Sequence, residues 1–289
     1  MAKYLSDNAW KNYLLNSIQS VAWPDVRLQP ARVALAPGID VTIIPHLEEF
    51  DFAAHLYRRM NYETEVASWL LDRKYDVVIE IGANVGIYTL LFSKLWPASS
   101  IYCFEPSRKA YRRLLENLAL NDCPNVFPLN CAVAQQTGLV DFYEPDGHLT
   151  NGSLDRSFAS LFSGSVNSTK VASLSGNELR RLVPAGANLL LKIDVEGAEP
   201  IVVHSLEPLI SDARPDILIE VLPQTADALN EQAMFASYHL FQLEPAGPRE
   251  RPAFVAGQHR DYALVPHPVG LNEKLFASAA ALPPQARIL

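Results

Sequence analysis

The sequence reads VVIEIGANVG over residues 77–86 and then continues into an apolar run with helical spacing as far as Leu95. Its first five residues are apolar except for Glu80, and glycines follow at positions 82 and 86. A continuously apolar strand that turns through glycines into a helix is typical of the first unit of a doubly wound α/β sheet. Ligands bind to such sheets beyond the carboxyl ends of the strands. This stretch therefore predicts a buried strand followed by a ligand-binding turn.

Downstream of this unit, apolar segments of strand length alternate with amphipathic segments of helix length, a pattern that predicts βαβ units and a parallel sheet. Two later apolar segments flank residues 245–252, which we interpret as a hairpin connection that adds an antiparallel pair at the sheet edge. We therefore predict an α/β, Rossmann-like, doubly wound and mostly parallel sheet of seven strands with an antiparallel edge strand. The predicted strands are Val77–Ile81, Ile101–Phe104, Val126–Leu129, Leu189–Ile193, Ile217–Val221, His239–Leu243 and Arg260–Val265. The predicted helices lie near Val85–Leu95, Arg108–Leu120, Pro200–Ile210 and Thr225–Phe235.

Three segments organise the chain. We expect residues 1–60 to form an N-terminal extension with one amphipathic helix and two short strands, residues 61–270 to form the main domain, and residues 271–289 to form a tail. The polar residues 144–168 interrupt the βα pattern and are rich in Gly, Ser, Asn and Thr. A polar insertion on the ligand side of the sheet could serve as a lid.

Composition narrows the class of protein. The 24 Lys and Arg residues against 32 Asp and Glu residues give a net charge of −8, the wrong sign for a protein that binds a phosphate backbone. No stretch reaches the roughly 18 consecutive apolar residues of a membrane span, and the three cysteines do not suggest a disulfide framework. We therefore expect a cytoplasmic protein that acts on a small molecule, not on nucleic acid or a membrane. The oligomeric state stays open, and a homodimer is compatible with the sequence.

The glycine turn has the form G-x-N-x-G, which differs from the dinucleotide fingerprint G-x-G-x-x-G and from the Walker pattern. Glu80 precedes the turn, where a carboxylate would repel a pyrophosphate and could accept a hydrogen bond from a ligand ammonium. Glu105 ends the second strand about 20 residues after the first glycine, at the position expected for a residue that binds ribose hydroxyls. The helix dipole beyond it offers a structural explanation for the same carboxylate. The pattern favours a nucleoside that carries an amino-acid tail.

Charged residues crowd the end of the fourth strand, where Lys192, Asp194, Glu196 and Glu199 follow three leucines. The neighbouring strand carries Glu220 at the corresponding end. Charged groups at the edge of a buried sheet cost free energy unless they are paired or used, so this cluster is a candidate functional site. A structural ion network, with Lys192 neutralising one carboxylate, is the alternative.

Taken together, these motifs resemble the FkbM family of class I S-adenosylmethionine-dependent methyltransferases. The motifs are VIEIGANVGIY at 78–88, FEP at 104–106, NLALN at 117–121 and KIDVEGAE at 192–199, in family order and spacing. The resemblance implies that the glycine turn lines the methionine end of the cofactor, Glu105 holds the ribose, and residues 130–132 face the adenine. The cofactor-binding residues that it implies are Tyr62, Glu63, Glu80, Gly82, Ala83, Asn84, Gly86, Glu105, Pro106, Asn130, Cys131, Ala132 and Asp194.

The resemblance further implies methyl transfer from S-adenosylmethionine, with S-adenosylhomocysteine as the product. A hydroxyl acceptor needs a base within hydrogen-bond reach, and Asp194 is our first candidate, with Glu220 and His148 as the other candidate catalytic residues. We expect no metal, although several carboxylates could hold a divalent cation. The predicted reaction is O-methylation of a sugar, polyketide or peptide in natural product biosynthesis.

Three alternatives stay open. The position where enzymes that methylate planar nitrogens usually carry a Pro-Pro-aromatic turn reads Val195-Glu196-Gly197, so an N-methyltransferase is the weaker hypothesis. An NAD-dependent oxidoreductase would share the sheet and Glu105 but lacks the central glycine of the fingerprint. A cofactor-binding module without catalysis would not need the carboxylate cluster.

Overall fold

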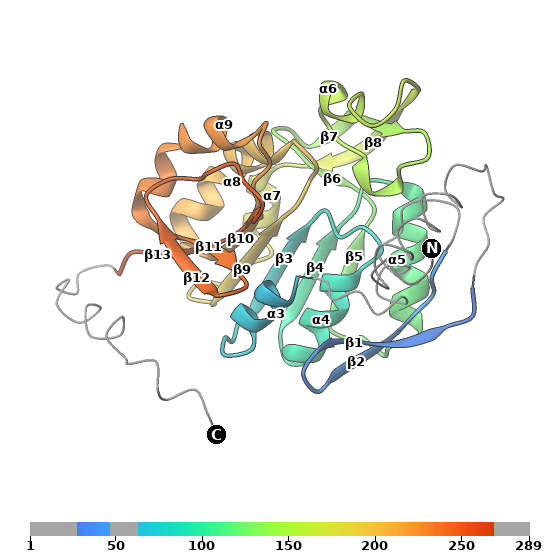
Figure 1. The fold of residues 1–289 in the computed structure, drawn as a ribbon, viewed down its shortest axis with the longest axis horizontal. Helices are drawn as coiled ribbons and strands as arrows, with labels where there is room; N and C mark the ends of the chain where they lie inside the picture. The colour runs from blue at the N-terminus through green and yellow to red at the C-terminus, as the bar shows by residue number, and fades with distance from the viewer. Residues whose placement is uncertain (1–27, 47–62, 269–289) are drawn as a thin grey trace, which may run out of the picture.

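The computed structural model describes residues 28–46 and 63–268. Their main sheet has eight strands in the order β12-β11-β13-β10-β9-β3-β4-β5 (Figure 1). The five strands β10, β9, β3, β4 and β5 run parallel, whereas β13 is antiparallel to both of its neighbours and β12 is antiparallel to β11. The strands are β3 (Val77–Ile81), β4 (Ser100–Phe104), β5 (Val126–Leu129), β9 (Leu189–Ile193), β10 (Asp216–Glu220), β11 (Tyr238–Glu244), β12 (Gly247–Arg251) and β13 (Asp261–Pro266).

Helices cover both faces of this sheet because successive residues of a buried strand point to opposite faces. Val77, Ile79 and Ile81 of β3 pack in one core cluster with the apolar residues of α8, whereas Val78 belongs to a second cluster with residues of α3 and α4. The helices are α3 (Thr64–Leu70), α4 (Ile87–Leu95), α5 (Arg108–Ala119), α7 (Gly176–Arg180), α8 (Glu199–Ala213) and α9 (Ala226–Asn230), with the 3-10 helix η2 (Ala233–Ser237). The predicted Rossmann-like α/β class is confirmed.

The sheet has one strand more than predicted. Residues 245–252, interpreted as a connection only, contain β12, which pairs with β11 from Leu240↔Arg251 to Glu244↔Gly247. The polar residues and Pro248 obscured this strand in the sequence. Because β12 has a partner on one side only, its proline can lie on an edge without removing a ladder hydrogen bond from the sheet interior.

A second, three-stranded sheet lies at one end of the molecule, in the order β6-β8-β7 (Figure 1). Its strands are β6 (Ala132–Val133), β7 (Gly138–Pro145) and β8 (Val166–Leu174). Between β7 and β8 lie the 3-10 helix η1 (Leu149–Asn151) and the short helix α6 (Arg156–Ala159). The predicted insertion at 144–168 is therefore the end of a long hairpin whose strands continue beyond it on both sides.

The hairpin of β1 (Ala31–Ala36) and β2 (Ile39–Ile43) is held by two asparagines, Asn117 of α5 and Asn121, which follows that helix. Asn117 Oδ1 accepts a hydrogen bond from the Ile44 amide at 2.9 Å, and Asn121 Oδ1 accepts one from the Thr42 amide at 2.8 Å. Asn117 Nδ2 also donates to the Val85 carbonyl at 2.8 Å, so the hairpin is linked to the glycine turn. The helix predicted within residues 4–20 and the tail after residue 270 lie outside the described residues.

None of the helices in 28–46 and 63–268 combines the length and the apolar character that a membrane crossing requires.

Candidate active site

A cavity opens at the carboxyl ends of β3, β4 and β9. Its floor is the glycine turn after β3, its sides are the ends of β4 and β9, and part of its cover comes from the insertion between β7 and β8. The cavity therefore occupies the position where doubly wound sheets bind their ligands.

The glycine turn depends on close contact between two strand ends. Gly82 has φ +87, and a Cβ built on it would lie 1.7 Å from the backbone oxygen of Asp194. The Asp194 amide in turn donates to the Ile81 carbonyl at 3.0 Å. Gly86, the N-cap residue of α4, has φ +88, and a Cβ there would lie 2.3 Å from Leu114 Cδ1. Gly82 thus brings β3 against β9, whereas Gly86 lets α4 pack on α5.

Two buried carboxylates line the cavity. Glu105 Oε2 accepts a hydrogen bond from the Asn84 amide and Glu105 Oε1 accepts one from the Ser107 amide, both at 2.7 Å. Glu80 Oε2 accepts a hydrogen bond from the Thr89 hydroxyl at 2.6 Å. Burial raises the pKa of each carboxyl to about 7, although the amides at Glu105 and the Lys192 ammonium near Glu80 oppose the rise. A ligand that supplies hydrogen-bond donors or positive charge would stabilise their ionised forms.

Lys192 provides positive charge at the strand ends. It stands opposite Glu80 in the register of β9 with β3, and its ammonium donates to Asp194 Oδ2 at 2.9 Å. The same ammonium lies 4.5 Å from the centre of the Tyr88 ring, whose hydroxyl donates to Glu63. Lys192 is buried, and this ion pair fixes the direction of the Asp194 side chain, which is 28% exposed.

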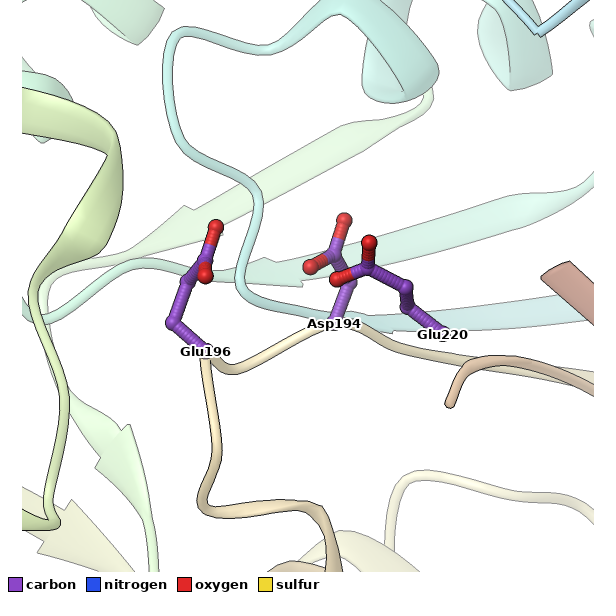
Figure 2. Close-up of side chains that lie close together, drawn as sticks. All are labelled: Asp194, Glu196 and Glu220. Carbon is purple, nitrogen blue, oxygen red and sulfur yellow. The ribbon is translucent and has the colours of Figure 1, made fainter. Parts of the chain in front are cut away.

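Carboxylates from neighbouring strands gather beside this ion pair. Oxygens of Asp194, Glu196 and Glu220 lie within 4.8 Å of one another, and their side chains point to the same side of the strand ends (Figure 2). Burial and the charge of Asp194 raise the pKa of Glu196 to about 8 and that of Glu220 to about 10. Arg260 approaches Glu220 Oε1 at 3.7 Å. Among the described residues, Lys192 and Arg260 are the cations that approach this cluster within 4 Å.

The insertion covers the cavity and contacts the loop after β9. Leu149, Thr150, Gly152 and Leu154 line the cavity from this side, and Asn151 Nδ2 lies 3.5 Å from Glu196 Oε2. A Cβ on Gly197 would lie 2.5 Å from the ring of Phe158, so α6 packs directly on that loop. The structure places the insertion against the site, and its closure as a lid stays a prediction.

Nine of the residues predicted to bind the cofactor line the cavity: Glu80, Gly82, Ala83, Asn84, Glu105, Pro106, Cys131, Ala132 and Asp194. The other members of the predicted set lie elsewhere. Gly86 packs against Leu114, Asn130 donates to the carbonyls of Glu105 and Pro106, and Glu63 accepts a hydrogen bond from the Tyr88 hydroxyl. Tyr62 falls outside the described residues.

The candidate bases are also separated. Glu220 lies beside Asp194 but lines a smaller neighbouring cavity. His148 lies in a separate depression and contacts the ring of Phe162, so it does not face the main cavity. His148 immediately precedes η1, whose residues Leu149 and Thr150 do line the main cavity. The direction of the chain at the start of η1 therefore places the His148 side chain in the neighbouring depression.

Sequence reasoning assigned no site role to several residues that line the cavity. Tyr88 was quoted in a motif without a role. Lys192 was placed in the charged cluster as the partner of one carboxylate, and the structure pairs it with Asp194. Phe142, Leu149, Thr150 and Leu154 come from the hairpin and insertion, and they carried no signal because their position follows from the second sheet.

The sheet order, and the cavity above the glycine turn, define a Rossmann-like α/β protein with a candidate ligand site at its strand ends. The family model described as "Methyltransferase FkbM domain" matches residues 80–243. The chain belongs to the FkbM methyltransferase family.

Several known proteins are similar to this chain. "Methyltransferase 1" of Beauveria bassiana is 23% identical over 231 residues, which cover 71% of this chain and 89% of that protein. "2-O-methyltransferase NoeI" of Sinorhizobium fredii is 33% identical over 78 residues, which cover 27% and 31%. The structure of "Methyltransferase FkbM" from Methylobacillus flagellatus aligns with a TM-score of 0.45 at 13% identity and covers 68% of this chain and 45% of that one.

Proposed function

We propose that this methyltransferase uses S-adenosylmethionine to methylate a hydroxyl oxygen of a small molecule such as a sugar, a polyketide or a peptide. The observation that carries the proposal is a cavity at the strand ends that places two buried carboxylates beside a third, Asp194, which is held by a buried lysine. The relative named as a 2-O-methyltransferase supports oxygen as the acceptor atom.

The residues present fit this cofactor. Asn84 Oδ1 is buried at the glycine turn and has no hydrogen-bond partner, so a polar ligand would satisfy it. Glu105 is placed to accept hydrogen bonds from ribose hydroxyls, and Glu80 lies beside the turn where a ligand ammonium would be stabilised. When bound, S-adenosylmethionine supplies an electrophilic methyl group on a sulfonium.

Asp194 performs the protein's part in proton transfer. Its Oδ2 is occupied by the Lys192 ammonium, which leaves Oδ1 to accept a proton from an acceptor hydroxyl. Lys192 fixes this direction, and the insertion helps to exclude water from the cavity. The chain therefore aligns the acceptor, takes up its proton and keeps the reaction away from solvent.

Calorimetric titration and an acceptor screen test the proposal. We expect the protein to bind S-adenosylmethionine and not NAD, and we expect an acceptor to gain the mass of one methyl group on oxygen. Asp194→Asn should lower turnover by about 10²–10⁴-fold, the usual contribution of a general base, with cofactor affinity nearly unchanged. Asp141→Asn is the matched control because Asp141 lies on β7 and pairs with the exposed Lys170.

Three results would contradict the proposal. NAD binding without S-adenosylmethionine binding would indicate an oxidoreductase. Methyl transfer to a nitrogen atom would contradict the assignment of oxygen as the acceptor atom. Transfer of an aminocarboxypropyl group would contradict methyl transfer itself, and a relative 28% identical over 83 residues is named as an aminocarboxypropyltransferase. Full activity in Asp194→Asn would move the base to another residue.

A further inference from the structure

The side chain of Asn117 joins two segments that lie far apart in the sequence. It is buried, with 1% of its surface exposed. Its Oδ1 accepts a hydrogen bond from the Ile44 amide, directly after the β1–β2 hairpin, and its Nδ2 donates to the carbonyl of Val85 in the glycine turn. A carboxamide holds its acceptor and its donors in one plane, so the two bonds together fix the position of the turn relative to the hairpin.

Apolar packing joins the same two segments. One buried cluster combines residues of the hairpin, the glycine turn, the helices α4 and α5 and the insertion. Its members are Val33, Val41, Ile43, Val85, Ile87, Leu90, Ala110 and Leu149. Val85 and Leu149 also line the main cavity, so hairpin residues pack in the same cluster as two residues of the cavity wall.

The peptide bond between Val85 and Gly86 is held at both of its polar groups. The Val85 carbonyl accepts the bond from Asn117, and the Gly86 amide donates to the Ala83 carbonyl at 2.9 Å. Within this turn Asn84 has φ +50, a left-handed conformation that costs free energy in residues with a Cβ. Such conformations persist where the surrounding structure restrains them, and the bond from Asn117 is a restraint on the residue next to Asn84.

The conformation of Asn84 in turn determines what the turn presents to a ligand. Its amide donates to Glu105 Oε2 at 2.7 Å, and both residues line the main cavity. Its side-chain Oδ1 is buried and, within 28–46 and 63–268, accepts no hydrogen bond. A turn that relaxed out of the left-handed conformation would change the direction of the amide and would release Glu105.

We propose that Asn117 is a positioning residue for cofactor binding. The described residues that line the main cavity do not include it, so it acts through the Val85 carbonyl and keeps Asn84 in the conformation that orients Glu105. This inference rests on the proposed function, since it concerns the site assigned to S-adenosylmethionine, and it adds the β1–β2 hairpin to the elements that build that site.

Asn117→Asp tests the proposal with a change of one atom. The aspartate keeps an oxygen for the Ile44 amide but places a second oxygen against the Val85 carbonyl, where two acceptors repel each other. We expect calorimetric titration to show S-adenosylmethionine binding weakened about tenfold or more, the scale of one lost hydrogen bond in a buried site.

Asn121→Asp is the matched control. Asn121 Oδ1 accepts from the Thr42 amide at 2.8 Å, and its Nδ2 donates to the carbonyls of Thr42 and Asn117, both at 2.6 Å. The same atomic change therefore loosens the hairpin but, among the described contacts, breaks no bond to the glycine turn. Both variants should melt at a lower temperature, whereas S-adenosylmethionine affinity in Asn121→Asp should stay within about twofold of the unsubstituted protein. Equal losses of affinity in the two variants, or unchanged affinity in Asn117→Asp, would overturn the proposal.

Hydrogen exchange reports on the turn without any ligand. Exchange at the Asn84 amide, which Glu105 protects, should accelerate about tenfold or more in Asn117→Asp and stay near its original rate in Asn121→Asp. Unchanged exchange at Asn84 in Asn117→Asp would refute the positioning role even if binding weakened. Should either aspartate variant fail to unfold cooperatively, alanine at the same two positions provides the same comparison. If the unsubstituted protein does not bind S-adenosylmethionine, the proposed function fails, and exchange at Asn84 alone decides whether Asn117 positions the turn.

Discussion

Gly82→Ala tests the contact on which the site is built, namely the approach of the glycine turn to the backbone of Asp194. Two costs are expected. The left-handed conformation costs a residue with a Cβ about 1–2 kcal/mol. The new Cβ would also lie 1.7 Å from the Asp194 oxygen, which belongs to the backbone and cannot rotate away. Forcing an extra atom into a packed site typically costs about 1–3 kcal/mol more.

Gly186→Ala separates these two costs. Gly186 has φ +77, close to the φ of +87 at Gly82, but a Cβ on it meets no atom within 4 Å. The control therefore carries the conformational cost alone. For a domain of this size each kcal/mol corresponds to about 2–4 °C, so Gly82→Ala should melt about 2–12 °C below Gly186→Ala.

Scanning calorimetry measures both melting temperatures, and titration with S-adenosylmethionine shows whether the turn still binds. We expect Gly82→Ala to lose binding, because separation of β3 from β9 moves two cavity walls apart, and Gly186→Ala to retain it. Equal melting temperatures in the two variants would refute the reasoning, since the clash would then cost nothing.

Three further predictions concern other parts of the structure. Burial raises the pKa of Glu105 to about 7, above its unfolded value of about 4.3. Its stabilising contribution is therefore complete below the unfolded pKa and is lost as the pH rises through 7. In urea titrations from pH 4 to 8, the free energy of unfolding should decline less steeply with pH in Glu105→Gln than in the unsubstituted protein. Phe158→Ala should cost about 3 kcal/mol or more and accelerate hydrogen exchange within the insertion, because the ring packs on Gly197. Asn117→Ala should cost about 1–3 kcal/mol, and exchange at the Ile44 amide should increase because that amide loses its acceptor.

The sequence was sufficient to predict the parallel core and the part of the main cavity that the ends of β3, β4 and β9 form. Strands buried on both faces are continuously apolar, as in β3 and β9, and their order along the chain brings the glycine turn, Glu105 and Asp194 to one edge. These are properties of single segments, so they can be read directly from the residues.

The second sheet could not be predicted in the same way. β8 reads VNSTKVASL, and most of its residues are exposed or half-buried, so it resembles a polar loop in composition. Its strand character comes from pairing with β7 over eight residue positions, from Gly138↔Ser173 to Pro145↔Val166. The missed wall residues Phe142 and Leu149 depend on that pairing, and the placement of His148 away from the cavity depends on the turn that follows it.

Asp194 links the two halves of the proposed reaction through different atoms. Its backbone oxygen lies against Gly82 and so determines the shape of the glycine turn, whereas its side chain is held by Lys192 and lines both cavities. Substitutions of the side chain and of the facing glycine should therefore have separable effects. Asp194→Asn preserves the backbone contact and should impair turnover, while Gly82→Ala preserves the carboxylate and should impair cofactor binding. Loss of cofactor binding in Asp194→Asn, or full cofactor binding in Gly82→Ala, would contradict this division of roles.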